Sequence, residues 1–176
     1  MRLISVKTHN FRQYKDLELT FPKNGSYDIH ILEASNGVGK TNFLNAINWC
    51  LYGDEPHKSG IFQRDDIHET KDDSNSLPLY NIEVMQELKE TGASFCLVKV
   101  IVELDIDGEK YTFTREQSFK VDNGVPFGQE KRTCSRLTSF GNTEFLQEDD
   151  IYTKLQTVLP KDIREYFYFD GEQLLT

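Results

Sequence analysis

The segment that most constrains the fold is the octapeptide A-S-N-G-V-G-K-T, from Ala34 to Thr41. It satisfies the pattern Gly-x-x-x-x-Gly-Lys-Ser/Thr at every defining position except the first. The apolar, β-branched run before it predicts a strand from Asp28 to Glu33. The apolar spacing after it predicts a helix that ends near Gly53. The alternative is an ordinary glycine-rich turn between a strand and a helix.

The chemistry of phosphate binding explains the residue types in this segment. Gly37 and Gly39 allow the backbone to approach a phosphate closely and to point its N–H groups at it. Lys40 would place its ammonium on the β- and γ-phosphates, and Thr41 would put its hydroxyl on Mg²⁺ at the helix N-terminus. Ala34 adds only a methyl group where the turn needs little side chain, so the departure is tolerated. The sequence therefore predicts a phosphate-binding loop.

Length and composition limit the other possibilities. At 176 residues, with 38% hydrophobic residues, the chain fits one domain with a proper core. The net charge of −9 argues against broad nucleic-acid binding by this chain alone, because phosphate contacts need clustered Lys and Arg. Lys131, Arg132 and Arg136 make the segment E-K-R-T-C-S-R locally basic. We considered it either as a nucleic-acid patch or as a solvated loop.

The sequence also indicates the compartment. No apolar run reaches the roughly 18 to 20 residues that span a membrane, and the N-terminus lacks the apolar core and cleavage site of a signal peptide. Cys50, Cys96 and Cys134 are far apart and odd in number, which predicts neither a disulfide framework nor a metal cluster. These features favour a cytoplasmic protein without a membrane partner.

Periodicity predicts several further elements. The first 21 residues favour two strands, and the run around Asp107-Gly108 is a strong hairpin signal. Residues 54–94 are turn-rich, and residues 121–145 look irregular with short strands at most. Asp149 or Asp150 is expected to cap a helix that Pro160 closes. The aromatic segment at 165–173 favours a buried strand that leads into a polar turn.

Three segments together resemble a known family. T-H-N-F-R-Q-Y-K-D-L-E-L-T-F, at 8–21, resembles the opening of the SMC, RecF and double-strand-break-repair ATPase heads. The segment at 34–53 is similar to their phosphate loop and to the helix that ends in Leu-Tyr-Gly. F-Y-F-D-G-E-Q-L, at 167–174, resembles DndD-type and Lamassu-type defence ATPases. Residues 54–150 carry little of the resemblance beyond the hairpin.

The resemblance implies a fold and a ligand. The fold would be an α/β P-loop NTPase, the N-terminal half of an ABC-type (SMC-like) head with a mixed β-sheet around the loop helix. Residues 1–176 would form its ATP-binding lobe, with Walker A at 34–41 and a Q-loop-like segment at 168–173, ending at the root of a coiled coil. ATP and Mg²⁺ would be the cofactors. The implied nucleotide contacts are Arg12, Ser35, Asn36, Gly37, Val38, Gly39, Lys40, Thr41 and Asn42.

Two of the implied roles have alternatives. Arg12 matches the arginine of the family's N-F-R motif and would contact phosphates, but it could also be a simple surface charge. Asp170 stands where most of the family has a glutamine that helps to hold Mg²⁺ and the attacking water. Gln173 competes with it for this role, and a plain turn aspartate is the third reading. The resemblance thus implies Lys40 and Asp170 as catalytic residues and Thr41 and Asp170 as metal ligands.

Activity and partners follow from the same resemblance. The chain contains no Leu-Ser-Gly-Gly signature and no apolar strand that ends in Asp-Glu, so ATP hydrolysis is expected only when a C-terminal lobe completes the head. ATP would be sandwiched between two heads of a homodimer and would control DNA engagement and a nuclease or effector, in DNA repair or anti-phage defence. The alternatives are a small P-loop kinase-like enzyme and a non-catalytic interaction module.

Overall fold

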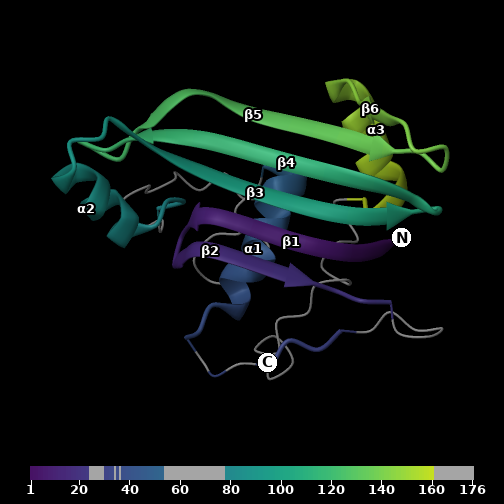
Figure 1. Cartoon of the computed structure of the whole chain (residues 1–176), viewed down its shortest axis with the longest axis horizontal. Coiled ribbons are helices and arrows are strands. Elements are labelled where there is room, and N and C mark those ends of the chain that lie inside the picture. The colour runs from purple at the N-terminus through teal and green to yellow at the C-terminus, as the bar shows by residue number, and fades with distance from the viewer. Residues whose placement is uncertain (24–29, 34, 36, 54–77, 161–176) are drawn as a thin grey trace, which may run out of the picture.

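A single six-stranded sheet dominates the chain (Figure 1). The computed structural model describes residues 1–23, 30–33, 35, 37–53 and 78–160. Within these ranges the strand order is β2-β1-β3-β4-β5-β6. The strands are β1 (Arg2–Phe11), β2 (Tyr14–Thr20), β3 (Phe95–Ile106), β4 (Glu109–Lys120), β5 (Pro126–Leu137) and β6 (Thr143–Phe145). The helices are α1 (Lys40–Tyr52), α2 (Ile82–Glu90) and α3 (Glu148–Val158).

The described sheet is antiparallel at every pairing, so the expectation of a mixed sheet is wrong for this part of the chain. The strand expected up to Glu33 is also wrong over residues 30–33, which are not in a strand; its first two residues lie outside the described ranges. Ile31 is 87% exposed rather than buried on a strand face. A strand needs a neighbour to pair its backbone groups, and none of the described strands pairs with residues 30–33.

The central hairpin is confirmed. β3 and β4 pair along their full length, and Asp107 and Gly108 form the turn with φ of 55° and 85°. Left-handed conformation at both residues is typical of the two-residue turn that matches the twist of antiparallel strands. Along β3, buried and less buried residues alternate, so Val98, Val100 and Val102 all face the inner side of the sheet.

Two elements were missed or underestimated. Residues 121–145 contain the long strand β5. Its sequence shows no clear alternation of apolar and polar residues, because Cys134 is its only fully buried side chain. α2 begins after Asn81, whose side chain accepts a hydrogen bond from the Val84 N–H at 3.0 Å. Asparagine at this position is a favourable N-cap, so a local signal for α2 was present in the sequence.

The C-terminal helix is confirmed but its predicted cap is wrong. α3 begins after Gln147, which makes no side-chain capping bond. Asp149 and Asp150 lie inside the first turn instead, together with Glu148. Acidic side chains there interact favourably with the positive end of the helix dipole, which explains why they mark the helix start without capping it. The expected strand at 165–173 lies outside the described residues.

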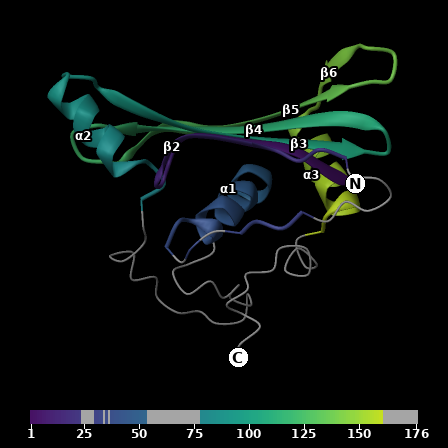
Figure 2. The same cartoon turned by 60° about the horizontal axis from the view of Figure 1, so that its bottom comes forward.

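α1 packs against the inner face of the sheet, across β1, β3 and β4. Figure 2 shows α1 and α3 on the same face of the sheet, with α2 at the end away from α3. α1 is buried around most of its circumference, beyond the predicted stripe, and Trp49 lies 5.8 Å from the Phe11 ring. The helix ends at Gly53, as expected, with φ of 77° and a backbone bond to the Trp49 carbonyl.

Arg115, from β4, holds the C-terminal end of α1. Its Nε donates to the Cys50 carbonyl at 3.1 Å, and its Nη1 donates to Glu130. The guanidinium lies 6.0 Å from the Trp49 ring centroid, and its side chain is only 6% exposed. A cation at a helix C-terminus is favourable, because the last carbonyls carry a partial negative charge.

The three cysteines pack in the interior as thiols. Cys50, Cys96 and Cys134 are free and buried. Burial raises the pKa of the Cys50 thiol to about 12 and that of Cys134 to about 12. Among the described helices, none is both long and apolar enough to cross a membrane.

Arg115→Met should lower the free energy of unfolding by about 2 kcal/mol, the scale for losing hydrogen bonds that a buried charged group makes. Methionine keeps much of the arginine stem, so packing on Trp49 is largely retained. Urea unfolding followed by Trp49 fluorescence measures the loss. Arg136→Met, at a more exposed arginine, is the matched control and should lose less. Equal losses in both variants would contradict the role of Arg115 at the end of α1.

The native chain should react slowly with a thiol reagent at pH 8, and all its thiols should react once urea unfolds it. Their raised pKa keeps the buried thiols protonated, and burial blocks the reagent. Rapid labelling of a native thiol at pH 8 would show that the core is open there.

The raised pKa of Cys50 also makes the free energy of unfolding depend on pH. Because the folded pKa lies above the ordinary value of 9.0, the contribution of Cys50 to stability is present below pH 9 and falls as the pH rises towards 12.

Candidate phosphate-binding site

The N-terminus of α1 carries the features of an anion site. Gly39 precedes the helix with φ of 108° and has no side chain that could cap it. The first turn holds no acidic residue. The first N–H groups of any helix lack partners within the helix, and the helix dipole adds a partial positive charge at this end. A glycine-rich turn at such a point is suited to bind a phosphate through backbone groups.

Glycine at position 39 is favoured by its backbone conformation and by the side chains that pack against it. A Cβ at this position would lie 1.6 Å from Nε2 of Gln13 and 2.6 Å from the Tyr14 hydroxyl. Both neighbours come from the hairpin between β1 and β2, far away in sequence. The ends of these two side chains therefore occupy the space that a Cβ at residue 39 would take.

Hydrogen bonds join the same hairpin to the loop. The Gln13 amide donates to the Val38 carbonyl at 2.7 Å, and the Tyr14 hydroxyl donates to the Gly39 carbonyl at 2.7 Å. The amide of Asn42, in the first turn of α1, donates to the Gln13 side-chain oxygen. The hairpin between β1 and β2 thus contacts both the glycine-rich loop and the first turn of α1.

Arg12 lies beside these contacts, as its predicted role requires. Its Nη1 donates to the Asn42 side-chain oxygen at 2.6 Å, and its backbone N–H donates to the Leu79 carbonyl at 2.7 Å. Arg12, Gln13 and Asn42 help to line a pocket of ≈ 290 Å³, together with residues that include Tyr80 and Ile82. The Arg12 guanidinium is therefore held at the helix N-terminus and borders an open concavity.

The remaining predicted loop residues lie around the same turn. The Lys40 ammonium donates to the Ser35 carbonyl at 3.1 Å, which folds the lysine back over the loop. Gly37 has φ of 81°, and the next residue, Val38, is 57% exposed. Thr41 is an exposed residue in the first turn of α1.

The structure thus brings together Arg12, Ser35, Gly37, Val38, Gly39, Lys40, Thr41 and Asn42. Asn36, Asp170 and the competing Gln173 lie outside the described residues, as does Ala34. Within the described ranges, no three His, Cys, Asp or Glu side chains are grouped so that they could hold a metal ion. The roles assigned to the individual residues remain predictions.

Sequence reasoning missed Gln13 and Tyr14. Both directly follow the Arg12 motif residue, but nothing in their spacing says that they reach a loop some 25 residues later. Burial raises the pKa of the Tyr14 phenol, so its hydroxyl stays protonated and remains a donor. The pairing of Phe11 with Tyr14 across the hairpin is what directs these side chains at the loop.

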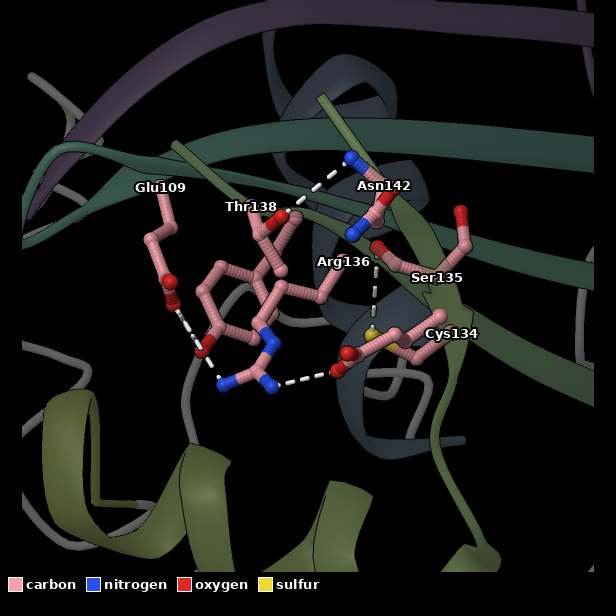
Figure 3. Close-up of polar contacts among 8 residues, drawn as sticks. Glu109, Cys134, Ser135, Arg136, Thr138 and Asn142 are labelled. Atoms are coloured by element: carbon pink, nitrogen blue, oxygen red, sulfur yellow. Dashed lines mark hydrogen bonds and ion pairs between the residues drawn. The ribbon is translucent and has the colours of Figure 1, made fainter. Parts of the chain in front are cut away.

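The locally basic segment lies in strand β5 rather than in a loop, and acidic side chains pair with its arginines. Arg132 lies 3.2 Å from Glu148. Arg136 pairs with Glu109 at 3.5 Å (Figure 3) and also with Glu144. The hydrogen bond to Glu144 is the main reason why the pKa of Arg136 is raised. This arrangement favours a structural role for both arginines over a nucleic-acid patch.

Comparison with known proteins gives two matches. A family model described as an AAA domain matches residues 5–174, nearly the whole chain. The chain is also 41% identical over 54 residues to the DNA replication and repair protein RecF of Clostridium kluyveri. That match covers 31% of this chain and 14% of the relative's length.

These matches agree with the phosphate loop at the start of α1 and with the motifs in the first hairpin. They support the N-terminal region of an ATPase of the SMC/RecF type with a P-loop NTPase fold. A match across residues 5–174 shows the family: the chain belongs to the AAA-domain family.

Proposed function

We propose that this chain is the ATP-binding lobe of an SMC-like ATPase, which couples ATP binding and hydrolysis to DNA engagement. The observation that carries the proposal is the loop at the start of α1, where Gly39 packs against the hairpin that delivers Arg12. The family match and the RecF similarity support the same reading. A glycine-rich backbone, a lysine and an arginine at one helix N-terminus suit a triphosphate.

The described residues fit ATP and Mg²⁺. The loop backbone at 37–39 would hold phosphate oxygens, with Lys40 on the β- and γ-phosphates and Arg12 approaching from the pocket side. Ser35 and Asn42 would complete the contacts around the loop, and the family resemblance adds Asn36, which lies outside the described residues. The Thr41 hydroxyl would supply an oxygen ligand to Mg²⁺, which neutralises charge that develops on the phosphates.

Hydrolysis needs groups beyond this site. We propose that Asp170 holds Mg²⁺, directly or through water, as the resemblance to DndD-type and Lamassu-type ATPases implies. A C-terminal lobe with the signature and Walker B motifs would supply the catalytic base. A second head would close over the nucleotide in a homodimer, and closure would control DNA and a nuclease or effector subunit. DNA repair and anti-phage defence, both in the cytoplasm, are the settings that this assembly suits.

Lys40→Ala should weaken Mg·ATP binding by on the order of a hundredfold, because charge-assisted hydrogen bonds to the phosphates are lost. The fold should be unchanged, since the Lys40 ammonium contacts the loop surface and not the core. Calorimetric titration with ATP and a urea unfolding curve measure the two effects. Lys15→Ala removes an exposed lysine that pairs with Glu83 and Glu87, and it should bind ATP normally. Equal affinity in both variants would refute the site.

Asp170→Ala should retain ATP affinity within roughly tenfold in a head completed by its C-terminal lobe, because the loop already holds the phosphates. Its single-turnover hydrolysis should fall by on the order of a hundredfold, the scale for one positioned catalytic group. Gln173→Ala is the matched comparison. Normal turnover in Asp170→Ala, with loss in Gln173→Ala, would assign the metal contact to Gln173. The same assay without the C-terminal lobe should show little turnover, whereas a complete kinase-like enzyme would not need the lobe.

A further inference from the structure

We infer that Gln13 and Tyr14 are positioning residues, which turn the peptide groups of the phosphate loop so that their N–H groups face the nucleotide. The inference rests on the proposed nucleotide-binding function and adds two residues that act through the loop backbone. Its basis is where their hydrogen bonds end: on loop carbonyls, on the side of the loop that faces the first hairpin.

The two hydrogen bonds act on consecutive peptide groups. Gln13 binds the Val38 carbonyl, which belongs to the same peptide group as the Gly39 N–H. Tyr14 binds the Gly39 carbonyl, which belongs to the same peptide group as the Lys40 N–H. In a planar trans peptide the C=O and N–H bonds point in opposite directions. Holding both carbonyls towards the hairpin therefore directs both N–H groups away from it, at the N-terminus of α1.

Glycine makes this control necessary. Gly39 has φ of 108°, in a region where glycine moves more freely than other residues, so the peptide group before it rotates easily. The peptide group after it is held in part by the first helical bond of α1. A rotated peptide would present a carbonyl oxygen to the phosphate and repel it. Gln13 and Tyr14 remove this freedom in advance, and preorganised donors bind an anion without a reorganisation cost.

The Gln13 amide itself is held in one orientation. Its nitrogen donates to Val38, and its oxygen accepts from the Asn42 amide. Rotating the amide by half a turn would put oxygen against the Val38 carbonyl and nitrogen against a donor, which breaks both bonds. Asn42 is fixed in turn because its oxygen accepts from Arg12. The network thus connects the arginine to the loop geometry through Asn42 and Gln13.

Tyr14 supplies the more rigid contact. It begins β2 and pairs with Phe11, so its ring is attached to the sheet rather than to a free loop. Its hydroxyl shares the Gly39 carbonyl with the Phe43 N–H, which makes the first helical bond at 2.9 Å. The same oxygen therefore fixes both the start of α1 and the direction of the Lys40 N–H.

Binding of Mg·ATP to the 176-residue chain tests the functional consequence. Gln13→Met keeps the length of the side chain without its hydrogen bonds, and Tyr14→Phe removes only the hydroxyl. Each should weaken affinity by about tenfold, while urea unfolding shows that the fold remains. Gln86→Met and Tyr152→Phe make the same changes at exposed positions of α2 and α3, and they should bind as the parent does. Parent-like affinity in both hairpin variants would overturn the inference.

Peptide orientation is measured without nucleotide. Amide residual dipolar couplings of Gly39 and Lys40 should change in Gln13→Met and Tyr14→Phe and stay constant in the two control variants. Unchanged couplings in the hairpin variants overturn the inference, whether or not ATP binds. Changed couplings support it, even in a chain whose parent fails to bind ATP, a result that would refute only the proposed function. Restored affinity in Gln13→Asn with a parent-like Gly39 coupling would support the role of an amide donor at this point.

Discussion

The packing of α1 on the inner face of the antiparallel sheet is the interaction on which the rest of the structure depends. A helix of this length is marginal alone, and its stability comes from the face that it buries. Trp49 and the residues around it contact β1, β3 and β4, and Arg115 holds the C-terminal end through the Cys50 carbonyl. Because the helix is fixed at that end and along its length, its N-terminus presents the loop to solvent in one orientation.

A second contact decides the geometry of that loop. The hairpin of β1 and β2 contacts the loop at Gly39, where its side chains occupy the space that a Cβ would take. Gln13 and Tyr14 donate to the Val38 and Gly39 carbonyls there. The conformational freedom that lets glycine approach a phosphate would also let the loop point its dipoles the wrong way. The hydrogen bonds from the hairpin restrict this freedom, and the same hairpin places the Arg12 guanidinium beside the loop. One turn thus supplies both a positive charge and the restraint on the loop carbonyls.

In the part of the chain that the structure describes, many charged side chains form ion pairs across neighbouring strands. On the outer face of the sheet Lys7 pairs with Glu18 at 2.7 Å, and Lys99 pairs with Glu116 at 2.8 Å, both across neighbouring strands. Exposed pairs of this kind contribute little stability, but they keep the surface polar and the register specific. The chain as a whole carries a net charge of −9, which offers little attraction to a polyanion. DNA engagement in our proposal therefore belongs to the complete assembly.

The sequence alone determined the features that depend on local pattern: the loop motif, α1 with its end at Gly53, the hairpin at Asp107-Gly108 and the helix before Pro160. It also selected Gly37, Gly39, Lys40 and Thr41 as candidate nucleotide contacts, because their residue types follow from phosphate chemistry, whereas the other candidates came from the family resemblance. Only the tertiary structure decided that the described sheet is antiparallel throughout and that residues 30–33 are not a strand, because pairing depends on which neighbours are present. It alone brought Gln13 and Tyr14 to the loop, since a hydrogen bond across 25 residues depends on how the hairpin packs and leaves no periodic trace in the sequence.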